Sequence, residues 1–259
     1  MRIKQSICCP MYVRDDLSMD QLCEAWAAIG GAAVELWGWG DDLEEIVATA
    51  KQHKLAVASM AGHGSLSGGL NKRSNHERIE AELRTSIDKA AALGIPGLIC
   101  FSGNCQPHMD QIEAIDACAD GLRPVAPYAE AKGINLNIEL LNSKIDHAGY
   151  QCDHTAWGVA VCEKVASPRV KLLYDIYHMQ IMEGDVIRTI RENIRWIGHF
   201  HTAGVPGRGD MDDSQELNYR GICSAIAETP YDLYVGHEFK PKGDPVEALR
   251  KAFEICDQG

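Results

Sequence analysis

Four apolar runs in the second half of the sequence each end in a side chain that can bind a metal or carry a proton. A charged group at the end of a buried run costs free energy unless it is paired. Three carboxylates brought together repel one another unless a cation lies among them. The pattern therefore predicts a site for one divalent metal ion, with an ion-pair cluster around Arg208 or Lys240 as the alternative. The four residues are Glu139, Asp175, His201 and Glu238.

The donor set is three carboxylates and one imidazole, with no thiolate at these run ends. Such an oxygen-rich set suits Mg²⁺ or Mn²⁺, and Co²⁺ or Zn²⁺ could substitute, whereas structural zinc needs four closed nitrogen or sulfur ligands. Alternation along strands predicts other roles for nearby residues. His199 is expected one layer deeper as a hydrogen-bonded core residue, and His237 is expected to point outward to the helices. Glu35 has two open interpretations: contact with a substrate, or a buried polar partner for a neighbouring strand.

These side chains need a scaffold that brings successive strand ends to one rim. Short apolar runs alternate with longer amphipathic ones along the chain, which is typical of repeated strand and helix units. Eight units of about 32 residues predict an α/β fold, a single (β/α)8 TIM barrel domain over residues 1–259, with its active site at the carboxyl ends of the strands. Strands are expected at 3–8, 33–37, 56–60, 97–101, 134–139, 170–175, 197–201 and 233–238. Helices are expected at 18–29, 41–53, 76–93, 109–131, 155–165, 186–193, 219–228 and 245–256.

Composition limits the partners. The chain has 259 residues and a net charge of −12, with 25 Lys and Arg against 37 Asp and Glu. This balance argues against nucleic acid and against an anionic membrane surface. No run has the length of a signal-peptide core or of a membrane span, which predicts a cytoplasmic protein. The ten cysteines contain no Cys-x-x-Cys pair and are expected to be reduced packing residues. A small-molecule substrate is expected, and assembly into a homo-oligomer is left open.

Several residues of the first half are expected near the mouth of the barrel. Segment 62–73 follows the third predicted strand and carries four glycines, so it is either a lid or a solvated connector. His63 lies in this segment and is a candidate substrate contact. Trp37 and Trp39 follow the second strand and either shape the substrate pocket or pack at the barrel mouth.

Several motifs resemble those of the hydroxypyruvate isomerase family. They are Tyr174-Asp-Ile-Tyr-His-Met-Gln180, Pro206-Gly-Arg208, Glu216-Leu-Asn-Tyr219 and Glu238-Phe-Lys-Pro241. That family is a branch of the xylose-isomerase-like barrels, which also include ketose 3-epimerases and 2-oxotetronate isomerases. The likeness runs from about residue 94 to residue 242, while the first ninety residues share the layout but few motifs.

The resemblance implies roles for individual residues. Glu139 and Glu238 look like the metal-binding glutamates that transfer protons, and Asp175 looks like a metal ligand. His178 and Arg208 resemble the family's contacts to substrate oxygens. Lys240 stands in a motif shared with the keto-acid isomerases and is a further candidate contact. His201 stands in the fourth ligand place, where hydroxypyruvate isomerases carry Gln and sugar epimerases carry His.

The resemblance predicts a metal-dependent isomerase of a small hydroxy-carbonyl compound. The expected reaction interconverts hydroxypyruvate and tartronate semialdehyde, or a related 2-oxo acid, by proton transfer through an enediolate. A ketose 3-epimerase would use the same residues. A hydrolase resembling the abasic-site endonucleases is a further alternative, although such enzymes need a multi-zinc site with more His. A barrel that binds metal or sugar without catalysis also stays open.

Overall fold

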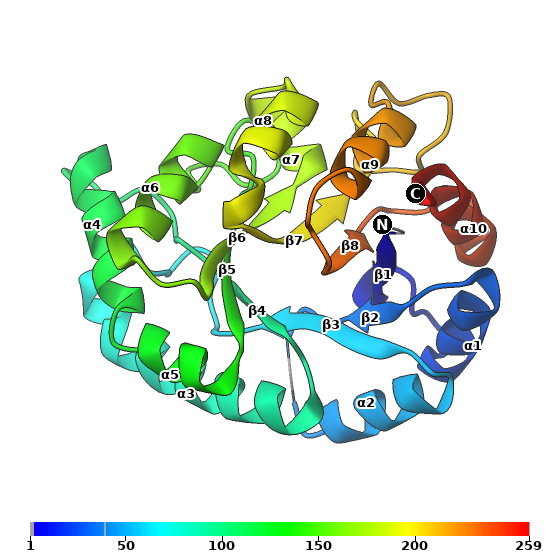
Figure 1. Ribbon diagram of the computed structural model, residues 1–259, viewed down its shortest axis with the longest axis horizontal. Coiled ribbons are helices and arrows are strands. Elements are labelled where there is room, and N and C mark those ends of the chain that lie inside the picture. The colour runs from blue at the N-terminus through cyan, green and yellow to red at the C-terminus, as the bar shows by residue number, and fades with distance from the viewer. Residues whose placement is uncertain (1–2, 39, 259) are drawn as a thin grey trace.

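A closed ring of eight parallel strands forms the centre of the computed structural model, which describes residues 3–38 and 40–258. The strands pair in chain order, and the first pairs with the last. Figure 1 shows them in the middle of the molecule with the helices around them. The predicted (β/α)8 TIM barrel is confirmed. The strands are β1 Lys4–Cys8, β2 Ala33–Glu35, β3 Ala56–Ala61, β4 Gly97–Cys100, β5 Asn135–Glu139, β6 Val170–Asp175, β7 Ile197–Thr202 and β8 Tyr234–His237.

Amphipathic helices cover the outside of the barrel, so most strand residues are buried on both sides of the sheet. Helix α1 begins with a capping box between Ser18 and Gln21 and ends at Gly30, whose φ of 114° suits a residue without a Cβ. The helices are α1 Met19–Ile29, α2 Leu43–Gln52, α3 His76–Leu93, α4 Gln111–Leu122, α5 Ala126–Lys132, α6 Thr155–Val165, α7 Ile176–Met182, α8 Val186–Asn193, α9 Tyr219–Ala227 and α10 Pro245–Cys256. Short 3₁₀ turns occur at Cys9–Met11, Arg73–Asn75 and Ile194–Trp196.

Two helices differ from the sequence prediction. The single helix expected at 109–131 is wrong, because the chain forms α4 and α5 with a break between them. Pro124 and Pro127 lack the N–H groups that a continuous helix needs, and Pro127 stands in the first turn of α5. The short helix α7 was not expected. It begins directly after β6, where the Asp175 carboxylate accepts a hydrogen bond from the backbone N–H of His178.

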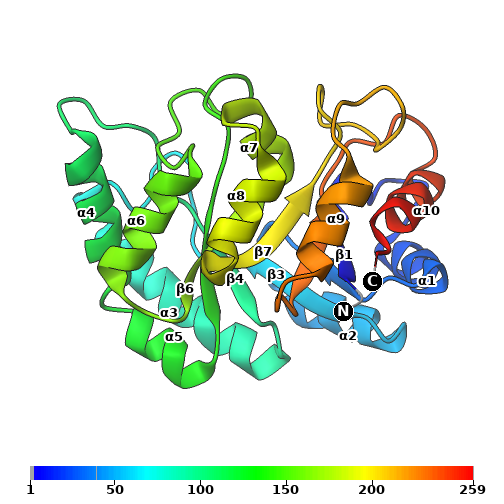
Figure 2. The same ribbon diagram turned by 45° about the horizontal axis from the view of Figure 1, so that its top comes forward.

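The two ends of the chain close the barrel together. Residues Lys4 to Ile7 of β1 pair with Tyr234 to His237 of β8. Outside them, α10 packs against α1, and Figure 2 shows the two helices side by side. Among the helices of the described residues, none combines the length and the apolar character needed to cross a membrane.

Candidate functional site

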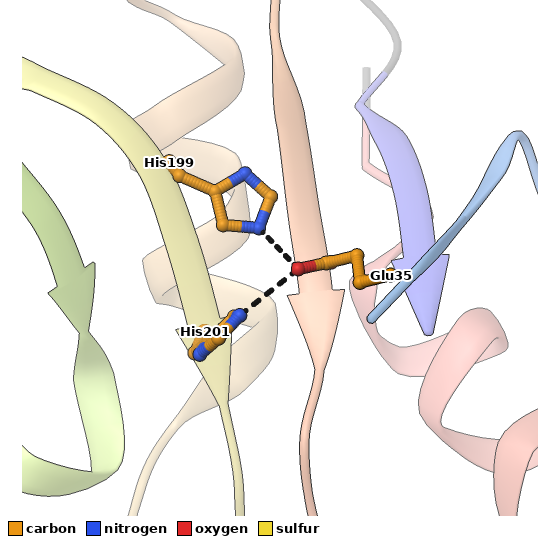
Figure 3. Close-up of side chains that lie close together, drawn as sticks. All are labelled: Glu35, His199 and His201. Carbon is orange, nitrogen blue, oxygen red and sulfur yellow. Dashed lines mark hydrogen bonds and ion pairs between the residues drawn. The ribbon is translucent and has the colours of Figure 1, made fainter. Parts of the chain in front are cut away.

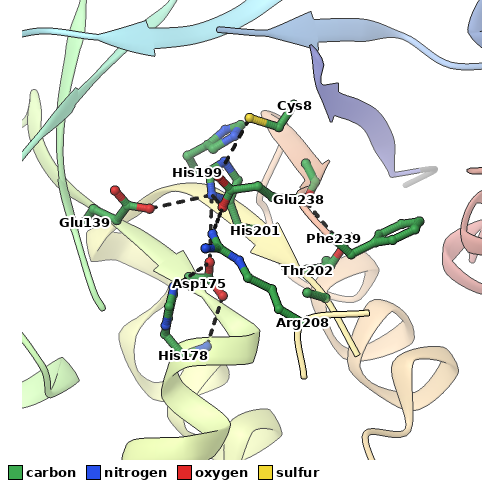
Figure 4. A network of polar contacts seen from close by, with 12 residues as sticks. Cys8, Glu139, Asp175, His178, His199, His201, Thr202, Arg208, Glu238 and Phe239 are labelled. Atoms are coloured by element: carbon green, nitrogen blue, oxygen red, sulfur yellow. Dashed lines mark hydrogen bonds and ion pairs between the residues drawn. The ribbon is translucent and has the colours of Figure 1, made fainter. Parts of the chain in front are cut away.

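The four residues expected at the strand ends come together at one end of the barrel. Glu139 ends β5, Asp175 ends β6, His201 lies in β7, and Glu238 follows β8 directly. One ligand atom from each lies within 4.8 Å of the others, and all four residues are buried. From His201 Nδ1, the nearest oxygen is 3.1 Å away on Glu238, 3.8 Å on Glu139 and 3.9 Å on Asp175. Figure 4 shows these side chains pointing toward one another.

The electrostatics of this cluster show a shortage of positive charge. Burial, reinforced by the charge of Glu238, raises the pKa of Glu139 to about 8. Burial raises the pKa of Asp175 to about 6, although Arg208 and His201 oppose the shift. Burial would raise the pKa of Glu238 too, but His201 and Arg208 outweigh it and lower that pKa. The charges of His201 and Arg208 therefore favour the ionised form of Glu238, while burial opposes ionisation of Glu139 and Asp175.

His201 is held from behind by Glu35, as Figure 3 shows. Glu35 Oε2 lies 3.0 Å from His201 Nε2 and 2.8 Å from His199 Nε2, while Glu35 Oε1 accepts a 2.5 Å hydrogen bond from Ser6. A carboxylate can only accept here, so Nε2 of His201 carries a proton. The other ring nitrogen, Nδ1, faces the carboxylate cluster, 3.1 Å from Glu238 Oε2. Within residues 3–38 and 40–258, no atom is placed to form a regular hydrogen bond with Nδ1.

Local backbone features let Glu35 reach this place. The register between β2 and β3 shifts between Val34 and Glu35, and such an irregularity re-aims a side chain. Gly236 on β8 leaves the necessary space, because a Cβ there would lie 2.1 Å from Glu35 Oε1. Of the two interpretations of Glu35, the structure shows the buried polar partner. The expectations for two histidines are also confirmed. His199 is a hydrogen-bonded core residue, and His237 faces Trp26 of α1 while bonding Thr202 and Gln5.

The donor set fits a divalent metal ion. Three converging carboxylates and an unbonded imidazole nitrogen are hard oxygen and nitrogen donors, which suit Mg²⁺ or Mn²⁺. The contact from His201 to Glu35 has the form of the outer carboxylate that orients a metal-binding His. The alternative ion pair is present for Arg208, whose Nη2 lies 2.5 Å from Glu238 Oε2. Lys240 does not join it, since its side chain is exposed.

His178 and Arg208 lie beside the cluster, and their implied contacts to substrate oxygens stay a prediction. His178 Nε2 is 3.7 Å from Asp175 Oδ2, and its Nδ1 is 2.6 Å from Asn142 Nδ2. Burial, with the charges of Arg208 and His147, lowers the pKa of His178 well below its usual value, so the ring is neutral. Arg208 has a φ of 55°, an uncommon conformation for a residue with a Cβ, and its Nε has no hydrogen-bond partner in the part of the chain that the structure describes.

A cavity of about 310 Å³ lies over the cluster. Its wall combines the polar groups of the site with an apolar side formed by Leu66, Ile99, Phe101 and Leu141. Trp37 contributes to the wall and donates a 2.8 Å hydrogen bond from Nε1 to Glu238, which shows that it shapes the pocket. Trp39 lies outside the described residues. His147 also lines the cavity.

Two candidate substrate contacts lie away from this wall. His63 is buried in a neighbouring hollow, where its Nδ1 bonds Gly64 O and its Nε2 accepts from the backbone N–H of Phe101. The Lys240 backbone N–H donates to Arg208 O, and its side chain points into solvent. Contact of either residue with a substrate stays a prediction, and it requires a side-chain rearrangement.

Segment 62–73 is attached to the barrel rim. Backbone N–H groups of Leu70 and Asn71 donate to Phe101 O and Ser102 O, at 3.1 and 2.8 Å. Leu66 reaches the cavity wall. The second half of the segment is therefore bound to the chain after β4 and is not a solvated connector, while a lid role for its first half stays a prediction.

Two residues of the site were not expected from the sequence, His147 on the cavity wall and Asn142 beside His178. Both lie in the loop after β5, Asn142 three residues and His147 eight residues beyond Glu139. Loops carry no periodic pattern, so the available signal was their place just after a strand end at the functional rim.

Comparison with known proteins agrees with this geometry. A model of the xylose isomerase-like TIM barrel family matches residues 23–258. A protein from Cupriavidus necator named 2-oxo-tetronate isomerase is 35% identical over 63% of this chain and 64% of its own length. The hydroxypyruvate isomerase of Escherichia coli is 29% identical over 67% of each chain. A human relative is matched over 62% of its length, so the alignment spans less than two thirds of several relatives.

A crystal structure titled AP endonuclease, family 2, from Brucella melitensis superposes with a TM-score of 0.85 over 98% of both chains, at 23% identity. At that identity the likeness concerns the fold. The family model matches most of this chain, and the chain forms the closed barrel, which shows that it belongs to the xylose isomerase-like TIM barrel family.

Proposed function

We propose that this protein is an isomerase of a small hydroxy-keto acid, with the interconversion of hydroxypyruvate and tartronate semialdehyde as the reaction to test first. The observation that carries the proposal is the pair Glu139 and Glu238, which line one cavity together with the cationic Arg208. The names of the relatives from Cupriavidus necator and Escherichia coli support the same class of substrate.

The glutamate pair would move the proton. One carboxylate removes a proton from C3 of hydroxypyruvate, and the C3–H electron pair becomes part of a C2–C3 double bond while the C2 oxygen takes up negative charge. Return of a proton to C2, with transfer of the hydroxyl proton from the C3 oxygen to the C2 oxygen, gives the aldehyde. The raised pKa of Glu139 and the lowered pKa of Glu238 suit an acid and base pair, which we assign jointly.

A divalent cation, Mg²⁺ or Mn²⁺, would be held by the four residues of the cluster. When bound, it would act as a Lewis acid toward the substrate oxygens. Glu139 and Glu238 would then serve both as ligands and as proton carriers, while Asp175 and His201 would hold the ion. Co²⁺ and Zn²⁺ are expected to substitute.

Arg208 and His178 would position the substrate. Arg208 lines the cavity and can form a charge-assisted pair with the substrate carboxylate. His178 can donate from Nε2 to an oxygen that gains charge during proton transfer. The apolar side of the cavity would exclude water from the reacting carbons.

The direct test is deuterium incorporation by the Mn²⁺-loaded protein in D₂O, followed by NMR with a panel of short keto acids and neutral ketoses. We expect deuterium at C2 of the product from hydroxypyruvate or a four-carbon analogue. Turnover of neutral ketoses without action on keto acids would favour a ketose epimerase and contradict the proposal.

Two variants sharpen this test. Glu238→Gln should lose activity by about 100-fold or more, since it removes a proton carrier. The exposed Glu216→Gln, outside the cavity wall, serves as the matched control and should keep its activity. If the activity of Glu238→Gln stayed within about tenfold of the original, the barrier would have risen by only about 1.4 kcal/mol, too little for a proton carrier.

A further inference from the structure

Asn142 is a buried amide whose orientation is determined by its neighbours. Its Oδ1 accepts hydrogen bonds from the backbone N–H groups of Ile145 and Asp146, both at 2.9 Å. Its Nδ2 donates a 2.6 Å hydrogen bond to Asp146 Oδ2. The oxygen end therefore faces backbone donors, and a flipped amide would place N–H against N–H at two positions. The Nδ2 end must face His178.

This orientation decides which nitrogen of His178 carries the proton. Asn142 Nδ2 lies 2.6 Å from His178 Nδ1, and an amide nitrogen is only a donor. Nδ1 must therefore accept, so the proton of the neutral ring is on Nε2. That Nε2 is buried and makes no hydrogen bond within the described structure. It points toward the carboxylate cluster, 3.7 Å from Asp175 Oδ2 (Figure 4).

We propose that Asn142 is a positioning residue that holds His178 in the tautomer with the proton on Nε2, so that a neutral ring donates to the substrate oxygen that gains negative charge. A buried N–H without a partner costs free energy, and its place beside the carboxylate cluster, 3.7 Å from Asp175 Oδ2, fits a donor reserved for a ligand. That this ligand is a substrate oxygen rests on the proposed function. The tautomer rests only on the hydrogen bonds of Asn142.

A purely structural role for Asn142 is the rival explanation, because it also holds the turn at 142–146. The two roles separate in a charge swap, Asn142→Asp combined with Asp146→Asn. The carboxylate introduced at 142 still accepts from the backbone N–H groups, and the net charge of the chain is unchanged. A carboxylate cannot donate to His178, so the ring proton should move to Nδ1. Asp146 Oδ2 accepts from both Asn142 Nδ2 and the Tyr177 hydroxyl. In the double variant the amide nitrogen at 146 would take this place and donate to the carboxylate at 142 and to the Tyr177 oxygen, which can accept.

The first readout is the ¹⁵N NMR spectrum of the histidine rings in the full-length protein, with the His178 signals assigned by their loss in His178→Gln. We expect a protonated Nε2 and an unprotonated Nδ1 in the original protein, and a protonated Nδ1 in the double variant. The single variant Asp146→Asn keeps Asn142 and should keep the original tautomer. An unprotonated Nε2 in the original protein, or an unprotonated Nδ1 in the double variant, overturns the proposal.

The second readout is kinetic. Loss of one hydrogen-bond donor to a developing oxyanion typically lowers kcat by about 100- to 1,000-fold. We expect a loss of this size in the double variant with little change in KM, at an unchanged melting temperature. A loss of kcat that only follows a lower melting temperature would show the structural role and overturn the proposal. If the original protein turns over no hydroxy-keto acid, the proposed function fails, while the NMR result still decides the tautomer.

Discussion

His201 illustrates how one side chain of the site depends on another across the barrel. Its ring lies between Glu35 on one side and the carboxylate cluster on the other, with nitrogen-to-oxygen distances of 3.0 and 3.1 Å to Glu35 and Glu238. Burial would lower the pKa of His201, but Glu238 and Glu35 outweigh it and raise that pKa. Metal binding at Nδ1 must displace any proton there, while the Glu35 contact holds the ring in place.

Replacement of Glu35 should therefore weaken metal binding. Glu35→Leu removes the acceptor and should lower Mn²⁺ affinity by about 10- to 100-fold, the usual cost of losing an outer carboxylate. Glu35→Gln keeps an acceptor oxygen and should lose less. Titration calorimetry on protein shown by circular dichroism to be folded measures both.

Ser59→Ala is the matched control, since Ser59 is a buried barrel residue whose Oγ has no hydrogen-bond partner among the described residues. Its affinity should match that of the original protein. Equal affinity in Glu35→Leu would contradict the orienting role of Glu35.

Among the elements, the sequence predicted those strands and helices that leave a local pattern of apolar and polar residues. Short apolar runs with polar ends located the strands, and so placed Glu139 and Asp175 at the rim. The role of Glu35 depends on a register shift in β2 and on the space beside Gly236, and neither feature leaves a local pattern. The place of Asn142 beside His178 depends on α7, a short helix without its own amphipathic signal. The break between α4 and α5 was visible in principle from Pro124.

Segment 62–73 offers a test of how a rim element supports the cavity. A Cβ at Gly69 would lie 2.4 Å from both Phe101 O and Gly103 N, and backbone atoms cannot move aside as a side-chain tip can. We expect Gly69→Ala to lower the free energy of unfolding by roughly 1–3 kcal/mol. It should also raise KM, because Leu66 of the same segment lines the cavity.

Gly64→Ala, in the same segment, is the control. A Cβ at Gly64 would meet no atom closer than 3.8 Å, so its stability and KM should match the original. Urea denaturation and steady-state kinetics measure both variants. Equal stability of Gly69→Ala and Gly64→Ala would contradict the close attachment of the segment.

For the whole molecule, the buried acidic cluster links stability to metal. A ligand that binds only the folded state adds about 2.7 kcal/mol at 100 times its Kd. For a chain of this size, we expect Mn²⁺ to raise Tm by roughly 5–10 °C. Differential scanning calorimetry with and without EDTA measures the rise. Asp175→Asn combined with His201→Ala should abolish it, and an undiminished rise in that variant would show that the ion binds elsewhere.

The pairing of β1 with β8 has a consequence for the order of events during translation. The chain is synthesised from its amino end, so Glu35 and Glu139 leave the ribosome well before Glu238, which follows the last strand. A nascent chain that stops before β8 has an open sheet edge beside β1 and lacks one of the four clustered side chains. The metal site is thus completed by the same step that removes the last exposed edge, so an ion held at full affinity reports a barrel whose synthesis has passed residue 238.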